Sequence, residues 1–133
     1  MSLNFLKDPI SDRMRILFFA RQDNEAGQRL RDAVQRAVPV NCLESYGSLD
    51  DFSRRLRAAK AENLVSVLLA SDRQELEGMQ GLKELLKDTH VILVIPDQEE
   101  RTVALAHRLL PRFLRLKSGD FKDVESVLGR IVR

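Results

Sequence analysis

The sequence holds a single cysteine, no tryptophan and no long apolar run, and each scarcity narrows the classes of protein it can encode. One cysteine, Cys42, excludes a disulfide within the chain and a zinc site built on several cysteines. No segment approaches the ~18 apolar residues of a membrane helix, and the first residues lack the pattern of a signal peptide. The formal net charge of +2 gives no reason to expect nucleic acid or a membrane as partner. We therefore expect a cytoplasmic domain.

The composition that is present is typical of one folded domain. The 133 residues are 44% hydrophobic and 32% charged, a balance that provides a packed core and a solvated surface. A chain of this length buries a substantial core without disulfides or metal ions. We assign the domain to residues 14–133 and interpret residues 1–13 as an N-terminal extension or as residues left by an expression vector.

Short apolar runs alternate with longer amphipathic segments along the chain. Because strands buried on both faces read as continuous apolar residues, the short runs predict strands at 15–20, 40–43, 64–70, 91–95 and 112–116. Apolar residues at helical spacing predict helices in 26–37, 49–59, 76–86, 103–110 and 121–131. Ser71 and Gln74 have the spacing of a helix-capping pair, and the nearby glycines leave a loop up to Gly81 as an alternative to helix.

The order of these elements predicts the fold class. Strands that are separated by helices usually run parallel in one sheet. Five such units are too few for an eight-fold barrel, so the sequence predicts a five-stranded parallel sheet in a doubly wound, three-layer α/β sandwich. In this architecture the functional edge lies at the carboxyl ends of the strands, and the residues just after each strand are the candidates for a site.

Three stretches near the strand ends have the spacing of a known family. Residues 70–78, ASDRQELEG, match the spacing between a phosphoryl-accepting Asp and a following Gly, and Ile95 lies 22 residues before Lys117. Residues 113–121 look like an aromatic-x-x-Lys stretch that leads into a last helix. Over residues 14–133 the chain resembles the receiver domain of two-component response regulators. The resemblance implies the same α/β fold and a role in signal transduction.

The residues that perform the chemistry of that family are replaced in this chain. A receiver holds Mg²⁺ with two acidic residues after its first strand, and an Asp at the end of its third strand accepts the phosphoryl group. Here these positions read Ala20-Arg21 and Ala70, and Ile95 stands where the family has Thr or Ser. Lys117 alone keeps the family residue. The chain therefore resembles a degenerate receiver, for which we expect no catalytic residue, no metal and no cofactor.

Three acidic residues offer a displaced site as an alternative. Asp23, Asp72 and Asp97 follow the first, third and fourth predicted strands, so the fold would bring them toward one edge. Carboxylate oxygens at such an edge are ligands for a hard cation, and Asp72 could replace the missing phosphoacceptor. The competing interpretation is that each carboxylate caps the helix that follows it.

Basic residues gather near the C-terminus and suggest an interaction surface. Residues 101–133 contain eight Lys or Arg and three Asp or Glu, a local balance of +5. The resemblance maps this region to the surface through which receivers usually dimerise or contact their outputs. Arg112, Phe113, Arg115 and Lys117 are its candidate contact residues, and a symmetric dimer would pair basic residues with acids of the second copy. The nearby acids are Asp120, Asp123 and Glu125.

Three functional hypotheses follow from the sequence. The first is a non-catalytic signalling module, a receiver-like domain that binds a protein partner or a second copy and is not phosphorylated at the usual site. The second is a small α/β enzyme or ligand-binding domain that uses the carboxyl edge of the sheet. The third is a true receiver whose acidic residues are displaced.

Overall fold

The computed structural model describes residues 14–22, 24–59 and 63–132, which form one five-stranded sheet. All strand pairs are parallel and their order is β2-β1-β3-β4-β5, which confirms the predicted α/β class. The chain order reverses between β1 and β3, where sheets of this kind place their ligand sites. The strands are β1 (Met14–Phe19), β2 (Leu43–Tyr46), β3 (Asn63–Leu69), β4 (His90–Ile95) and β5 (Phe113–Leu116).

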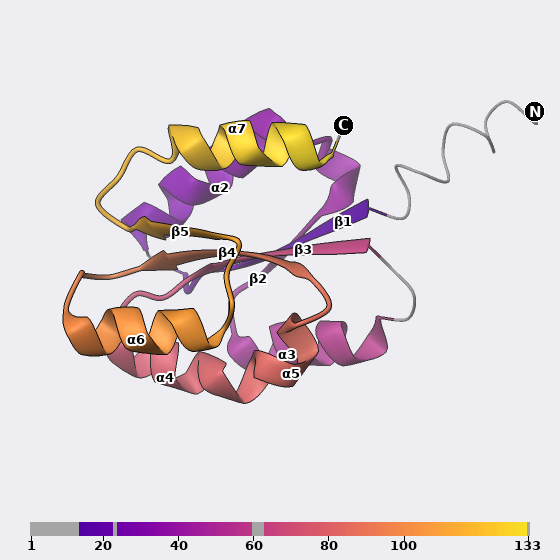
Figure 1. Cartoon of the computed structure of the whole chain (residues 1–133). Helices are drawn as coiled ribbons and strands as arrows, with labels where there is room; N and C mark the ends of the chain where they lie inside the picture. The colour runs from indigo at the N-terminus through magenta and orange to yellow at the C-terminus, as the bar shows by residue number, and fades with distance from the viewer. Residues whose placement is uncertain (1–13, 23, 60–62, 133) are drawn as a thin grey trace, which may run out of the picture.

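Helices cover both faces of the sheet and complete the three layers (Figure 1). One face carries α2 (Glu25–Ala37) and α7 (Lys122–Ile131), which lie side by side. The other carries α3 (Leu49–Ala58), α4 (Arg73–Met79), α5 (Lys83–Leu86) and α6 (Glu100–Arg108). None of the helices in the described ranges has both the length and the apolar composition needed to cross a membrane.

Each face of the sheet has its own hydrophobic core. Along β1, Ile16 and Phe18 belong to the cluster that includes side chains of α2 and α7. Leu17 and Phe19 belong to the other cluster, with side chains of α3, α4 and α6. Successive side chains of a strand point to opposite faces, so a strand covered on both sides must be apolar throughout. This is why the apolar runs located β1, β3 and β4 in the sequence.

The predicted position of the second strand is wrong. Residues 40–43 are mostly apolar, but Val40–Cys42 form a short 3-10 helix (η1) and β2 begins at Leu43. The N–H of Cys42 donates to the carbonyl oxygen of Pro39 at 3.0 Å, and the Val40 side chain is 77% exposed. β2 is an edge strand with polar side chains, so apolar content does not mark it. Cys42 is buried.

The helical segment after β3 is capped one residue later than predicted and contains no loop. Asp72 caps α4, because its carboxylate accepts a hydrogen bond from the Glu75 N–H at 2.8 Å. The predicted Ser71–Gln74 cap is therefore wrong. α4 passes through η2 (Gln80–Leu82) directly into α5, so the alternative of a loop up to Gly81 is wrong as well. Buried apolar side chains hold this segment against the sheet despite its glycines.

The helix after β4 ends earlier than its apolar pattern predicts. α6 stops at Arg108, and Leu110 has a positive φ of 54° and a side chain that is 67% exposed. Leu110 precedes Pro111, and a residue before proline is disfavoured in helical geometry. The prediction that Leu110 belongs to the buried stripe of this helix is therefore wrong.

Candidate functional site

The carboxyl ends of the strands bring the positions singled out by the receiver resemblance to one edge of the sheet. Ala70 follows β3, and its N–H donates to the carbonyl oxygen of Val94 in β4 at 2.9 Å. Lys117 follows β5, and its N–H donates to the carbonyl oxygen of Ile95 at 2.9 Å. Ala20 follows β1, and its N–H donates to the carbonyl oxygen of Tyr46 in β2 at 3.3 Å. The edge is thus built by continued strand pairing.

Three of these positions carry apolar side chains that can neither bind a metal ion nor accept or hydrogen-bond a phosphoryl group. Ala20, Ala70 and Ile95 are all buried. Ala20 packs against Gly27 of α2, where an added Cβ would lie 2.9 Å from the Ala20 Cβ. A longer side chain at position 20 would therefore meet the helix as well as the sheet. The packing of α2 on β1 depends on two small residues at this edge.

Arg21 is fixed by two carboxylates of the α4 region. Its guanidinium lies 3.2 Å from the carboxylate of Glu75 and 3.6 Å from that of Asp72. The Glu75 side chain is only 9% exposed, and its carboxylate also accepts a hydrogen bond from the Ser71 N–H at 2.8 Å. The loop after β3 and the loop after β1 are therefore joined by an ion pair at the place where a receiver holds its metal.

The described members of the proposed acidic cluster serve as helix-terminal hydrogen-bond acceptors. Asp72 caps α4, and the Asp97 carboxylate accepts from the Glu99 N–H at 2.9 Å. Hydrogen bonds from the Thr102 side chain and the Glu99 N–H lower the pKa of Asp97. Asp23 lies outside the described residues. Within the described ranges, no three His, Cys, Asp or Glu side chains are grouped so that they could hold a metal ion.

Lys117 is turned toward the main chain at the end of β3. Its ammonium donates to the carbonyl oxygen of Ser71 at 3.0 Å, across the sheet edge. The Ser71 hydroxyl in turn accepts a hydrogen bond from the side-chain amide of Asn24, the N-cap residue of α2. These contacts connect the ends of β1, β3 and β5. They involve main-chain and neutral groups. Among the described residues no carboxylate oxygen lies within 4.0 Å of the Lys117 ammonium, although its charge helps to lower the pKa of Asp97.

Arg29 is a site residue that the sequence analysis missed. It lies one turn into α2, and its guanidinium donates to the carbonyl oxygens of Lys117, at 2.9 Å, and of Gly119. The guanidinium carbon also lies 5.2 Å from the centre of the Phe121 ring. On a helix surface, a sequence pattern cannot distinguish such an arginine from an ordinary solvated one. Only the packing of α2 beside the segment that follows β5 brings it to Lys117.

These residues surround a depression of about 520 Å³ that we call the basic pocket. Arg21, Arg29 and Lys117 supply three positive charges, and Glu25 is the carboxylate among the described residues that line it. The other lining residues are Gln22, Asn24, Ala26, Ser71 and Ser118. The pocket lies at the point where the chain order of the sheet reverses. A receiver has carboxylates at its metal-binding positions here, whereas the described lining of this pocket has three cations and one carboxylate.

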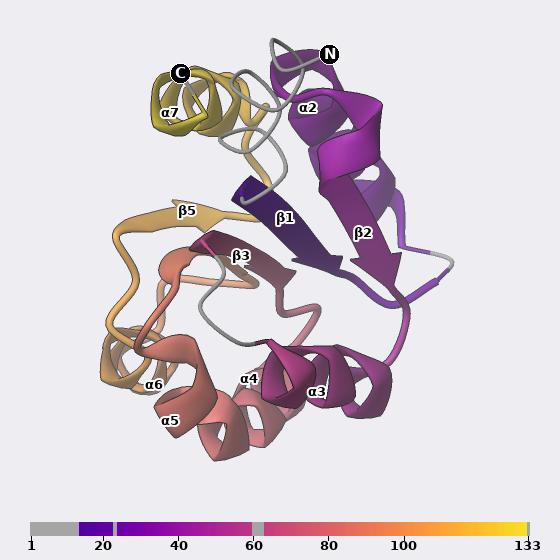
Figure 2. The same ribbon diagram turned by 90° about the vertical axis from the view of Figure 1, so that its right-hand side faces the viewer.

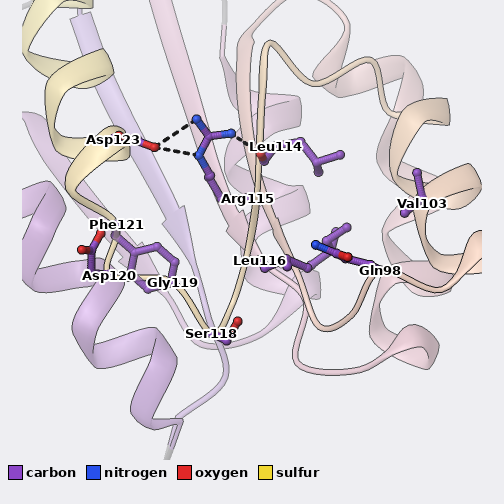
Figure 3. Close-up of a pocket in the computed structure, with 11 residues that line it drawn as sticks. Gln98, Val103, Leu114, Arg115, Leu116, Ser118, Gly119, Asp120, Phe121 and Asp123 are labelled. Carbon is purple, nitrogen blue, oxygen red and sulfur yellow. Dashed lines mark hydrogen bonds and ion pairs between the residues drawn. The ribbon is translucent and has the colours of Figure 1, made fainter.

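A second depression, which we call the β5 groove, lies between α6, β5 and the segment leading into α7 (Figure 3). Its volume is about 420 Å³. Val103 and the β5 residues Leu114 and Leu116 give it an apolar lining, with Gln98 and Arg115 among its polar residues. β5 is an edge of the sheet (Figure 2). An edge strand beside an apolar groove is a surface on which a polypeptide can dock.

The candidate contact residues lie in different settings around this groove. Arg115 is paired within its own chain, 3.1 Å from the carboxylate of Asp123 (Figure 3). Its guanidinium also lies over the Phe113 ring, 4.0 Å from the ring centre. The Arg112 side chain is exposed just before β5. Lys117 belongs to the basic pocket. The chain thus already supplies one of the acid–base pairs that a dimer was expected to form between copies.

Comparison with known proteins adds no relative: no family model, no curated protein and no solved structure matches the chain. The strand order and the layers establish a three-layer α/β fold.

Proposed function

We propose that this chain is a non-catalytic signalling module, a receiver-like domain that acts by binding protein and not by accepting a phosphoryl group. The strand order β2-β1-β3-β4-β5 is compatible with this assignment. Its degenerate positions Ala20, Ala70 and Ile95 are buried at one edge, where Arg21 is exposed and Lys117 is half-buried. A signalling domain that neither catalyses a reaction nor accepts a phosphoryl group acts through the surfaces with which it binds its partners.

The observation that carries the proposal is the ion pair between Arg21 and Glu75. A receiver needs free carboxylates beyond its first strand, because Mg²⁺ takes oxygen ligands and must offset the phosphoryl charge. Here a guanidinium occupies that region, and the carboxylate nearest to it is already engaged at 3.2 Å and is largely buried. The positive charge opposes a divalent cation, and the neighbouring Ala70 has no nucleophilic atom.

The surface formed by α6, β5 and α7 is the proposed docking face. It combines the apolar β5 groove with the exposed backbone edge of β5. The Arg115–Asp123 pair on its rim is partly exposed, with side chains 42% and 67% accessible. An ion pair this exposed is worth at most about 1 kcal/mol, so it can exchange partners at low cost. We propose that a second copy of the chain docks here, with Arg115 reaching an acid of the other copy.

Sedimentation tests this self-association. The wild-type chain is expected to dimerise weakly at about 0.1 M salt and to dissociate at about 1 M. The Debye length is about 10 Å at the lower salt concentration and about 3 Å at the higher, so ion pairs between the copies are screened more strongly at 1 M. Arg115→Glu is expected to abolish the dimer. The matched control is Arg54→Glu, which reverses an arginine of an exposed ion pair on α3, 2.9 Å from Asp51. A monomer at every concentration, or a dimer indifferent to salt and to Arg115→Glu, would remove this face from the proposal.

A further inference from the structure

We propose that the basic pocket binds a phosphate group non-covalently, as a small phosphate-bearing molecule. The site joins the loop after β1, the start of α2 and the ends of β3 and β5. This inference concerns the sheet edge and not the docking face. It does not depend on the domain being receiver-like, and a failed dimerisation experiment leaves it standing.

Two cations of the pocket have no carboxylate in direct contact among the described residues, and the Asp97 carboxylate acts on Lys117 only through its charge. Arg29 and Lys117 are half-buried, and within the described part of the chain their side chains contact main-chain carbonyl oxygens and, for Arg29, an aromatic ring. Among the described residues, no carboxylate oxygen lies within 4.0 Å of either cation. Carbonyl dipoles orient a cation without cancelling its charge. Partial burial of two like charges at one site favours the uptake of an anion.

The same contacts hold both cations in place before any ligand arrives. Arg29 is anchored at Lys117 and Gly119 and rests on Phe121, and Lys117 is anchored at Ser71. A guanidinium has five N–H groups and an ammonium three, so donors remain for a ligand on each. Side chains that are already ordered lose little entropy on binding, which strengthens the affinity for an anion.

The first turn of α2 adds further donors from a third direction. The helix begins at Glu25, and its first N–H groups have no acceptor within the helix. The Asn24 side chain accepts from the Gly27 N–H, and Asn24 and Ala26 both line the pocket. The Ser71 hydroxyl accepts from Asn24, so its own proton can be donated to a ligand. The positive end of the helix favours an anion here.

The chemistry of the pocket selects phosphate over a carboxylate or a metal ion. A phosphate group offers oxygen acceptors in several directions and carries close to two negative charges near neutral pH. Three parts of the chain supply donors to the lining: α2 with Arg29, the end of β3 with Ser71 and the end of β5 with Lys117. Donors on several sides of a pocket suit a tetrahedral anion. A volume of about 520 Å³ exceeds that of a bare phosphate and leaves room for a small organic group.

Isothermal titration with two probes at constant ionic strength tests the inference. Inorganic phosphate reports on a free anion, and adenosine monophosphate reports on a phosphate group carried by a larger molecule. We expect saturable binding of at least one probe. Arg29→Gln and Lys117→Gln are each expected to weaken it about tenfold, because each removes a charge-assisted hydrogen bond. Glu25→Gln is expected to strengthen binding several-fold, because it removes the carboxylate from the lining.

Arg36→Gln is the matched control. It removes the same charge from α2, seven residues further along the helix and beside Glu125, outside the basic pocket. Its affinity for the bound probe is expected to equal that of the wild type. The inference is overturned if neither probe binds, or if Arg36→Gln weakens binding as much as Arg29→Gln. The Glu25→Gln variant guards against misfolded variants, because a gain in affinity cannot come from loss of structure.

Discussion

The ammonium of Lys117 donates to the main-chain carbonyl oxygen of Ser71 at 3.0 Å and so ties the end of β5 to the end of β3. In the receiver resemblance, this lysine would meet a phosphoryl group attached at position 70. In this chain position 70 is a buried alanine, and the lysine is held by the residue after it. This hydrogen bond joins the ends of β3 and β5 in the absence of a phosphoryl group. Such a contact is what we expect of a module that works without phosphorylation.

Gly27→Ala is expected to destabilise the domain by about 1–3 kcal/mol, as overpacking typically does. The new Cβ would lie 2.9 Å from the Cβ of Ala20, a rigid atom that cannot swing away. Equilibrium denaturation measures the loss. Ala20→Gly in the same chain is expected to recover most of it, because it removes the opposing atom.

Gly129→Ala is the matched control for this helix–strand contact. Gly129 lies in α7, and an added Cβ there would have no atom within 4 Å. Alanine is expected to stabilise α7 by about 0.5–1 kcal/mol through its helix propensity. If Gly27→Ala and Gly129→Ala changed the free energy of unfolding alike, close packing at Ala20 would not be the reason for Gly27.

Tyr46, the single tyrosine, is expected to ionise well above its ordinary range. Burial and a hydrogen bond from its hydroxyl to the Glu44 carboxylate, at 2.7 Å, raise the pKa of Tyr46 to about 12. A raised pKa means that the folded state holds the proton more tightly. Its contribution to stability is therefore complete below the ordinary pKa of 10.0 and is lost as the pH rises toward about 12. The phenolate absorbance of the native protein measures this directly.

Glu44→Gln separates the two causes of this shift. It removes the negative charge but not the burial, so the pKa of Tyr46 is expected to fall part of the way toward 10.0. Asp51→Asn neutralises a carboxylate of α3 that pairs with Arg54, and it is expected to leave the titration unchanged. A native tyrosine that titrates near 10.0, as in the denatured chain, would show that the Tyr46–Glu44 contact does not form in solution.

The fold could be predicted because three strands are buried on both faces. Their apolar runs and the helical stripes between them are sufficient to give a parallel sheet in three layers. The second strand could not be placed, since β2 is an edge strand whose Glu44 and Ser45 are polar. The apolar residues of η1 led to the wrong prediction, because apolar content alone does not distinguish them from a strand. Val40 is in fact exposed, and the N–H of Cys42 donates to the carbonyl oxygen of Pro39 and closes a helical turn.

The candidate site could be predicted only as a set of positions. Counting from the strand ends located Arg21, Ala70 and Lys117 at one edge. Nothing in the sequence pairs Arg21 with Glu75, because that contact depends on where α4 begins relative to β1. Arg29 could not be found for a similar reason. Its carbonyl partners lie 88 and 90 residues away, in the segment after β5.

Intact mass after incubation with a small phosphodonor and Mg²⁺ tests the central claim, that the domain is not phosphorylated, most directly. With Ala70 at the acceptor position and Arg21 paired to Glu75, the account predicts that the mass of the protein does not change. A gain of one phosphoryl group that disappears on Asp72→Ala or on Asp97→Ala would contradict it, because the chain would then be a working receiver with a displaced acceptor.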